Sequence, residues 1–236
     1  TSFVTTTKLS IIIPAYNEAA SLPKLLTYLE NQIKSLCGIE VIVVDGGSSD
    51  QTVAVSRSFG IHVIDSPKGR AIQMNNGAKV ATGVILYFLH CDSFPPNGFI
   101  NQILEAQKAG KFAGCYRLKF DWNHWFLNLN AWFTRFNVNS LRFGDQSLFI
   151  VKSLFEQIGG FREDLVIMED QEIIYRISEK AKFFILPEYI TTSARKYRLN
   201  GVYRMQYIFF YIFFSYQLGA TQEKLVAIYK ALIKTN

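Results

Sequence analysis

The stretch VILYFLHCDS, residues 84–93, decides the fold, because it is an almost continuous apolar run of the length of a β-strand. Such a run is typical of a strand that is buried on both faces in the middle of a mostly parallel sheet. The run ends abruptly in His90, Cys91 and Asp92. Because open α/β sheets bind ligands beyond the carboxyl ends of their strands, Asp92 is the first candidate for a functional residue.

The composition of the whole chain limits its class. With 236 residues, of which 49% are hydrophobic, the chain is long enough for one sizeable α/β domain. Its formal charge of +6 is moderate and spread out, without a Lys or Arg run that could follow a nucleic-acid backbone. We therefore expect no nucleic acid, but an anionic small ligand or a negatively charged membrane surface. The three cysteines are odd in number and lack metal-type spacing, which indicates reduced thiols in a cytoplasmic protein.

The first part of the chain alternates strands with helices. Apolar strands are expected within residues 9–18, 41–45 and 61–65, and a helix over 22–36 follows the first of them, with Ser21 as its N-cap. This alternation predicts right-handed crossovers and a parallel sheet. Residues 9–95 therefore resemble a nucleotide-binding half, although no GxGxxG follows the first strand, which argues against a dinucleotide oxidoreductase.

The middle of the chain is rich in aromatic residues. We expect a helix over 97–109 and strands over 112–120 and 144–151, and Ser153 with Glu156 forms a capping-box pattern for a short helix. Between the two strands, aromatic and leucine side chains recur at helical spacing: Trp122, Trp125, Phe126, Leu129, Trp132, Phe133 and Phe136. This stripe fits a core or interface helix, and a sugar-stacking or lipid-facing surface is the alternative.

The last part of the chain is predicted to be largely helical. Residues 168–180 form a helix with Glu169 and Asp170 in its first turn, where acids either complement the helix dipole or serve catalysis. Residues 183–187 are a last strand. Residues 203–218 are apolar almost all round but too short to span a bilayer comfortably, so they fit a buried, membrane-surface or oligomer-contact helix. We expect an extended or disordered start over 1–8, one domain over 9–200 (with an acceptor half over 96–200), and C-terminal helices over 201–236.

Four segments in this order and spacing resemble glycosyltransferase family 2: IIIPAYNEAASL, VIVVDGGSSDQT, LHCDS and IMEDQEI. GRAIQMNNGA, residues 69–78, further resembles a bacterial subgroup of small soluble members. The resemblance covers roughly residues 8–200. It implies an α/β fold of the GT-A (Rossmann-like) type, with a mostly parallel sheet flanked by helices and a C-terminal helical appendage. It also implies an inverting glycosyltransferase of the hexosyltransferase type, which moves a sugar from a nucleotide-sugar donor to an acceptor hydroxyl.

The resemblance also assigns roles to particular residues. Asp92 matches the last acid of the family's Asp-x-Asp motif and would bind a divalent cation, Mn²⁺ or Mg²⁺, whereas His90 replaces the first acid. Glu169 and Asp170 match the acid pair that holds the catalytic base, with Asp170 the better candidate. The nucleotide-sugar would contact residues from several segments: Pro14, Ala15, Tyr16, Glu18, Asp45, Arg70, Asn75, Cys91, Asp92, Arg195 and Lys196.

Several of these assignments have a structural alternative. Asp45 before two glycines is also ordinary turn chemistry, Glu18 is also a helix-entry carboxylate, and Arg70 is also a candidate for a surface salt bridge. SARKY, residues 193–197, keeps basic residues but lacks the Gln of the Gln-x-x-Arg-Trp motif, which argues against a processive polysaccharide synthase.

Two other functions remain open on the sequence. One is a non-catalytic nucleotide-sugar-binding protein of the same fold, and the other is a sugar-nucleotide pyrophosphorylase. For the transferase, we expect a UDP- or GDP-linked donor and a sugar or lipid-linked acceptor. The expected location is the cytoplasm, including the inner membrane face. Residues 203–218 would form either the peripheral membrane contact or the contact of a homo-oligomer.

Overall fold

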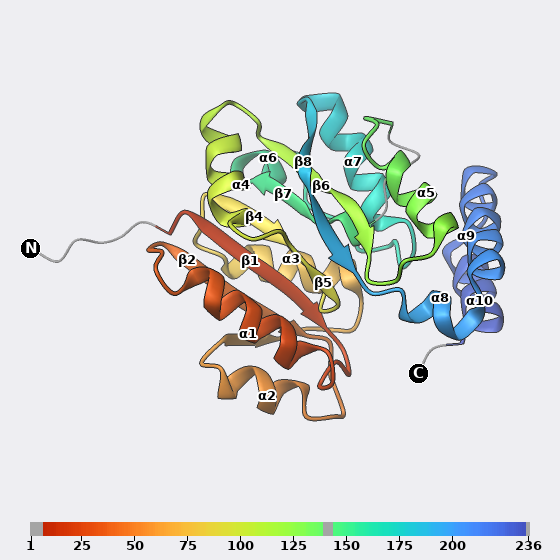
Figure 1. The fold of residues 1–236 in the computed structure, drawn as a ribbon, viewed down its shortest axis with the longest axis horizontal. Coiled ribbons are helices and arrows are strands. Elements are labelled where there is room, and N and C mark those ends of the chain that lie inside the picture. The colour runs from red at the N-terminus through yellow and green to blue at the C-terminus, as the bar shows by residue number, and fades with distance from the viewer. Residues whose placement is uncertain (1–6, 139–143, 235–236) are drawn as a thin grey trace, which may run out of the picture.

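The computed structural model describes residues 7–138 and 144–234, so most of the extended start expected over residues 1–8 lies outside these ranges. Within them, eight strands form one sheet in the order β3-β2-β1-β4-β7-β6-β8-β5, with helices on both of its faces (Figure 1). The strands are β1 (Leu9–Ala15), β2 (Ile39–Asp45), β3 (His62–Asp65), β4 (Ile85–Phe88), β5 (Ser93–Phe94), β6 (Ala113–Phe120), β7 (Leu148–Val151) and β8 (Phe183–Thr192). The helices are α1 (Leu22–Ile33), α2 (Thr52–Ser58), α3 (Arg70–Val80), α4 (Phe99–Lys108), α5 (Trp125–Phe133), α6 (Lys152–Gln157), α7 (Glu169–Lys180), α8 (Arg195–Asn200), α9 (Val202–Gln217) and α10 (Gln222–Leu232).

The parallel sheet expected from the first part of the chain is present. Strand β1 pairs in parallel with β2 and with β4, and β2 pairs in parallel with β3. All four residues of β4 are buried, between β1 on one side and β7 on the other. The prediction of a central strand buried on both faces is therefore confirmed, although Val84 is 48% exposed and lies just before it.

The other half of the sheet is mixed. Strand β7 is antiparallel to both β4 and β6, while β6 and β8 are parallel and β5 is antiparallel to β8. Strand β8 continues to Thr192, beyond the expected end at residue 187, and its last residues pair with Ser93 and Phe94. This extension brings the C-terminal segment next to Asp92, whose carbonyl oxygen accepts a hydrogen bond from the Ser193 N–H at 3.2 Å.

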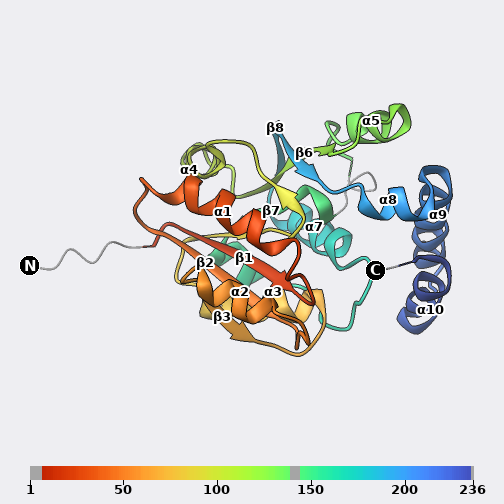
Figure 2. The same ribbon diagram turned by 60° about the horizontal axis from the view of Figure 1, so that its bottom comes forward.

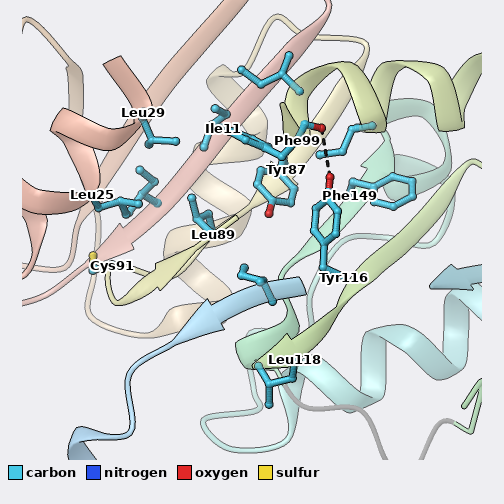
Figure 3. Close-up of a cluster of buried hydrophobic side chains, with 14 of the residues drawn as sticks. Ile11, Leu25, Leu29, Tyr87, Leu89, Cys91, Phe99, Tyr116, Leu118 and Phe149 are labelled. Atoms are coloured by element: carbon cyan, nitrogen blue, oxygen red, sulfur yellow. Dashed lines mark hydrogen bonds between the residues drawn. The ribbon is translucent and has the colours of Figure 1, made fainter. Parts of the chain in front are cut away.

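Two hydrophobic cores lie on opposite faces of the sheet. Helices α1 and α4 cover one face, and α3, α6 and α7 cover the other. Two tyrosines are fully buried in the first core, and their hydroxyl groups have partners, as burial requires. Tyr116 donates a hydrogen bond to the Phe99 carbonyl oxygen at 3.2 Å (Figure 3). Tyr87 donates one to Ser147 Oγ at 3.0 Å.

One local prediction about a helix start is wrong, and another is met in position only. Helix α6 begins at Lys152, directly after extended Val151, so Ser153 falls inside the first turn and the capping box with Glu156 is wrong. Ser21 does occupy the N-cap position of α1, but its side chain makes no capping hydrogen bond. The strand expected over residues 144–151 is also shorter, because Gly144–Gln146 forms a 3-10 helix before β7 begins.

The aromatic stripe of α5 does not form core as a whole. The helix buries only Leu127 and Ala131, while Trp125, Trp132 and Phe133 are exposed. Helix α9 buries one face against α10, and the two helices lie side by side at one end of the molecule, away from α1, α2 and α3 (Figure 2). In the described part of the chain, every helix is too short or too polar to span a membrane.

Gly77 tests the packing of α3 on the parallel strands. A Cβ at this position would collide with Ile12 and would lie 3.0 Å from Cγ2 of Val44. Alanine normally favours a helix over glycine by about 1 kcal/mol, but here we expect overpacking to dominate. Gly77→Ala should lower the free energy of unfolding, measured in urea, by about 1–3 kcal/mol. The control Lys79→Ala, on the exposed side of α3, should stay within about 0.5 kcal/mol of wild type; a Gly77→Ala variant as stable as this control would contradict the close packing.

Candidate active site

The loops that follow β1 and β2 are fastened to each other at the carboxyl edge of the sheet. Asn17 Oδ1 accepts a hydrogen bond from the Ser49 N–H at 2.8 Å, and the Asn17 N–H donates to Ser48 Oγ at 2.9 Å. The Glu18 N–H donates to Thr52 Oγ1 at 2.8 Å. These bonds hold the loop of Tyr16 and Glu18 against the loop that follows Asp45.

Asp45 is a buried carboxylate at the tip of β2. Its Oδ2 atom accepts hydrogen bonds from the N–H groups of Gly47 and Ser48 at 3.0 and 2.9 Å, which is the turn chemistry that the sequence indicated. Its Oδ1 atom is also buried, but no described residue donates to it. A buried acceptor without a donor is costly in a folded protein. The arrangement therefore leaves one carboxylate oxygen available for a ligand.

Gln73 of α3 closes the floor below this turn. Its side-chain Nε2 donates to the carbonyl oxygens of Ala15 and Val44, both at 2.8 Å, and so ties the ends of β1 and β2 to α3. Gly46 lies directly on this amide, because a Cβ there would come within 3.0 Å of the Gln73 side chain. The Gly-Gly turn after Asp45 thus fits closely over Gln73.

Asp92 follows β4 and lies among charged neighbours. Burial raises the pKa of its carboxyl group, and the nearby carboxylate of Asp145 raises that pKa further. His90, Lys196 and Arg195 act in the opposite direction. Asp145 belongs to the 3-10 helix Gly144–Gln146 that precedes β7. The fold therefore places a second carboxylate near Asp92, although His90 stands where the family motif has its first acid.

Glu169 and Asp170 open helix α7 and share a cation. Glu169 is fully buried and forms an ion pair with Arg70 at 2.7 Å, and Arg70 lies 3.9 Å from Asp170 Oδ2. Burial raises the pKa of Glu169 to about 7, with Arg70 opposing this shift and Asp170 adding to it. The Glu169 carboxylate in turn raises the pKa of Arg70, which keeps the guanidinium charged. Arg70 is thus a salt-bridge residue, but its partners are the candidate catalytic acids.

A small cavity lies between Asp170 and the end of the central strand. It has a volume of about 20 Å³ and is lined by His90, Asp170 and Ser147, with apolar side chains around them. The Asp170 side chain is 16% exposed, so it is the accessible member of the pair. The end of β4, the start of β7 and the start of α7 therefore meet at one point.

The C-terminal segment adds basic side chains to the same edge. Arg195, the first residue of α8, lies 4.0 Å from Glu18, and Lys196 is near enough to lower the pKa of Asp92. Lys68 Nζ lies 3.5 Å above the Tyr16 ring, which makes it a further cation at the loop after β1. These positive groups surround the carboxylates and would neutralise a diphosphate that binds between them.

Two of the expected donor contacts are engaged elsewhere. The Asn75 side chain donates to the Phe161 carbonyl oxygen and accepts from the Phe161 N–H, both at 2.9 Å. The buried Cys91 thiol, whose pKa is raised by burial, donates to the Pro14 carbonyl oxygen at 3.3 Å. Because these contacts are structural, we do not propose the side chains of Asn75 and Cys91 as donor-binding groups.

The sequence did not point to Asp145, Gln73 or Ser147. Asp145 and Ser147 lie between the aromatic segment and β7, where no periodic pattern marks them. The backbone does mark this region, because Asn17, Ser147 and Met168 are the described residues other than glycine that have positive φ, with values of 54°, 63° and 74°. Asn17 follows β1, Ser147 lines the cavity, and Met168 precedes the acid pair. Such backbone strain is concentrated at functional sites in proteins.

The donor set suits a divalent cation that arrives with a substrate. In the described ranges, no three His, Cys, Asp or Glu side chains are arranged to hold a metal ion by themselves. Asp92 and Asp145 nevertheless supply two neighbouring carboxylates. Mg²⁺ is commonly bound by one or two carboxylates together with substrate phosphates, and carboxylate oxygens also suit Mn²⁺. The residues present therefore fit such an ion.

Comparison with known proteins gives consistent relatives. A family model described as glycosyl transferase family 2 matches residues 10–166. An uncharacterized glycosyltransferase of Haemophilus influenzae is 30% identical, over 74% of this chain and 63% of that protein. Several other curated glycosyltransferases match over about a third of their own length.

Solved structures share the fold. The mannosyltransferase PcManGT from Pyrobaculum calidifontis, in complex with GDP-Man and Mn²⁺, superposes with a TM-score of 0.70 at 18% identity, over 85% of this chain and 61% of that chain. TarS of S. aureus in complex with UDP-GlcNAc gives a TM-score of 0.66 at 18% identity, over 79% and 58%. Both likenesses confirm the GT-A type of fold. Since the family model matches well over half of its residues, the chain belongs to glycosyltransferase family 2.

Proposed function

We propose that the protein is an inverting, metal-assisted glycosyltransferase, which moves a hexose from a UDP- or GDP-linked donor to an acceptor hydroxyl. One observation carries the proposal: Asp170 and His90 line the same cavity just beyond the end of β4. Asp170 is held there beside the Arg70–Glu169 ion pair. A carboxylate in that position is able to take the proton of an attacking hydroxyl.

The nucleotide would bind at the ends of β1 and β2. The Oδ1 atom of Asp45 is a buried acceptor and would receive a hydrogen bond from the base or the ribose. Ala15, Tyr16 and Glu18 would line the loop above it, with Lys68 nearby. Arg195 and Lys196 would close over the diphosphate from the side of α8. Support comes from the related fold of PcManGT, which was solved with GDP-Man, and of TarS, which was solved with UDP-GlcNAc.

The cation would be held by Asp92 and Asp145 together with the phosphates of the donor. When bound, Mn²⁺ or Mg²⁺ stabilises the negative charge that develops on the departing nucleoside diphosphate. The PcManGT complex, which contains Mn²⁺, supports this assignment. Burial of Asp92 beside Asp145 is unfavourable for two charged carboxylates, so a cation between them would relieve their repulsion.

Transfer would proceed by a single displacement. Asp170 accepts the proton of the acceptor hydroxyl while the hydroxyl oxygen attacks the anomeric carbon, and the bond to the nucleotide breaks on the opposite side. Arg70 faces both acids and balances the charge that Glu169 and Asp170 bring to the site. Glu169 is too buried to reach an acceptor, so we assign it to holding Arg70 rather than to proton transfer.

The acceptor would be a sugar or a lipid-linked hydroxyl. A dolichol-phosphate mannosyltransferase of Pyrococcus furiosus is among the curated relatives, which supports a lipid-linked molecule. The reaction would take place in the cytoplasm or at the inner membrane face, where an acceptor of this kind is accessible.

Calorimetric titration with UDP and GDP, each with and without Mn²⁺, tests the donor site. We expect one of the two nucleotides to bind, and to bind at least tenfold more tightly with the metal, because the carboxylates at the site repel a diphosphate. Absence of binding by both nucleotides to the folded protein would contradict the transferase assignment. Nucleotide binding of equal affinity with and without Mn²⁺ would contradict the proposed role of the metal but not the transferase assignment.

Two variants test the proposed cation ligands in the same titration. Asp92→Ala should abolish the effect of Mn²⁺ on nucleotide affinity, and Asp145→Asn should weaken it by about tenfold, since each removes one anionic ligand. Asp164→Asn is the matched control. The Asp164 carboxylate is exposed and pairs with Arg162 on its own loop, which is not the loop of Asp92 or Asp145. If Asp145→Asn left the effect of Mn²⁺ on nucleotide affinity unchanged, Asp145 would not be a metal ligand, and Asp92 would be the remaining proposed ligand.

Asp170→Asn tests the catalytic base. The amide keeps the size of the side chain but cannot take a proton, so we expect the rate of nucleoside diphosphate release from the bound donor to fall by about 10²–10⁴-fold. The dissociation constant of the donor should change by less than about threefold, because the proposed donor contacts are left in place. Such a change corresponds to about 0.7 kcal/mol, since 1.4 kcal/mol corresponds to tenfold. Glu179→Gln, at the exposed end of the same helix, is the control. If Asp170→Asn lost donor binding instead, Asp170 would have a structural or metal-binding role.

A further inference from the structure

Helices α5 and α9 expose an unusual number of large apolar side chains. Tyr207 is 69% exposed, Trp125 is 64% exposed, and Leu218, directly after α9, is 87% exposed. We use the name α5–α9 surface for the following exposed residues: Trp125, Leu129, Trp132, Phe133, Phe136, Tyr203, Tyr207, Phe210, Tyr211, Phe214 and Leu218. Soluble monomers rarely expose apolar side chains in such a group without an interaction partner.

The two helices form one continuous surface. The Tyr203 ring at the start of α9 lies 6.4 Å from that of Trp125 and 5.2 Å from that of Phe126. Farther along, Asn130 Nδ2 of α5 donates to Gln206 Oε1 of α9 at 2.9 Å. Figures 1 and 2 both show α5 beside one end of α9. The aromatic groups of the two helices are therefore neighbours in space, although about 70 residues separate them in the chain.

Helix α9 has two apolar faces with different surroundings. One face, with Met205, Ile208 and Ile212, is buried in the small core that α9 shares with α10. The opposite stripe recurs at helical spacing and is exposed: Tyr203, Tyr207, Phe210, Tyr211, Phe214 and Leu218. Internal packing of the described residues thus accounts for one face only.

Basic side chains are concentrated in the same part of the molecule. Residues 195–234 contain seven Lys and Arg against a single Glu. Because the whole chain has 25 basic and 19 acidic residues, the other 196 residues contain 18 of each and are formally neutral. The expectation of an evenly spread charge is therefore wrong: the net charge of +6 belongs to the C-terminal helices.

We propose that the α5–α9 surface docks the protein on an anionic membrane surface. Trp and Tyr are the side chains that favour the boundary between headgroups and acyl chains, and Phe214 and Leu218 provide apolar groups for insertion. The excess of positive charge attracts anionic lipids. A second copy of the chain would bring an equal positive charge to the interface, and a nucleic acid would offer no apolar partner to Leu218.

Docking at this surface would place the catalytic edge near the lipid. Helix α8 connects α9 directly to the end of β8, which pairs with the strand just after Asp92. Arg195, at the start of α8, reaches Glu18 in the loop after β1. The inference extends the membrane placement proposed above for a lipid-linked acceptor, but its test needs no turnover, so the two can fail separately.

Co-sedimentation of the full chain with vesicles tests the proposal. We expect binding to vesicles of phosphatidylcholine that contain about 30% of the anionic lipid phosphatidylglycerol. Binding to vesicles of pure phosphatidylcholine should be at least tenfold weaker, because they carry no net negative charge. The triple variant Tyr207→Ser, Phe214→Ser, Leu218→Ser should reduce the affinity by about tenfold or more, because these exposed groups supply the inserted apolar area. Arg204→Gln should reduce it by about fivefold.

Phe112→Ser is the matched control, because Phe112 is an exposed aromatic residue outside this surface, just before β6. It should bind vesicles as wild type does, and far-UV circular dichroism with nucleotide titration should show that all variants remain folded. Absence of binding to anionic vesicles, or equal binding by the triple variant, would overturn the proposal. So would self-association in sedimentation velocity that the triple variant abolishes while vesicle binding stays unchanged, since the surface would then belong to a second copy.

Discussion

The complete burial of β4 is the constraint on which the rest of the structure depends. Its four residues lie between β1 and β7 and are covered by a core on each face. An ionised side chain within the strand would lack both water and a partner, which is strongly unfavourable. The first imidazole and carboxyl groups along this part of the chain therefore come after the strand, at His90 and Asp92, whereas the hydroxyl group of Tyr87 within the strand is paired with Ser147. Strands β1 and β2 end at the same edge because β1 is parallel to both β2 and β4, and the loops after β1 and β2 meet there.

The site that results is a collection of acids, with basic side chains of α3, α8 and the loop before α3 around them. Asp45, Asp92, Asp145, Glu169 and Asp170 approach one edge of the sheet, and Arg70 is the cation that pairs with two of them. Burial raises the pKa of both Asp92 and Glu169, so the folded chain by itself disfavours their charged forms. A diphosphate alone would add to the repulsion. A divalent cation would reverse it, and the basic groups of α8 would then face the phosphates. The electrostatics of the site thus favour metal and nucleotide binding as one event.

The sequence predicts those features that periodicity or strand ends reveal. Strands β1, β2 and β4, with α7 and α9, follow from apolar runs and helical spacing, and the positions of Asp45, Asp92 and Asp170 follow from where those elements end or begin. Asp145 could not be found in this way, because a single acid in an unpatterned segment carries no signal until β7 places it. The side chains of Asn75 and Cys91 were assigned to the donor because of their neighbours in sequence, whereas helix geometry and burial direct them to the backbone of Phe161 and Pro14. For the aromatic stripe of α5, spacing shows that a face is apolar but not what covers it, so the sequence left core, interface and ligand-facing or lipid-facing surface open, and the structure buries only Leu127 and Ala131 of this helix.

The C-terminal helices combine two properties that oppose each other in water. Exposed aromatic side chains promote association, whereas a concentrated positive charge opposes the approach of another copy at low ionic strength. Neither property is needed for the small core between α9 and α10, which Met205, Ile208, Ile212 and Leu225 already form. An anionic, partly apolar boundary satisfies both at once, because the charge attracts the protein to the surface and the aromatic groups then retain it. The same charge that selects such a boundary would keep unbound molecules apart, so the surface can remain exposed until the protein reaches a membrane.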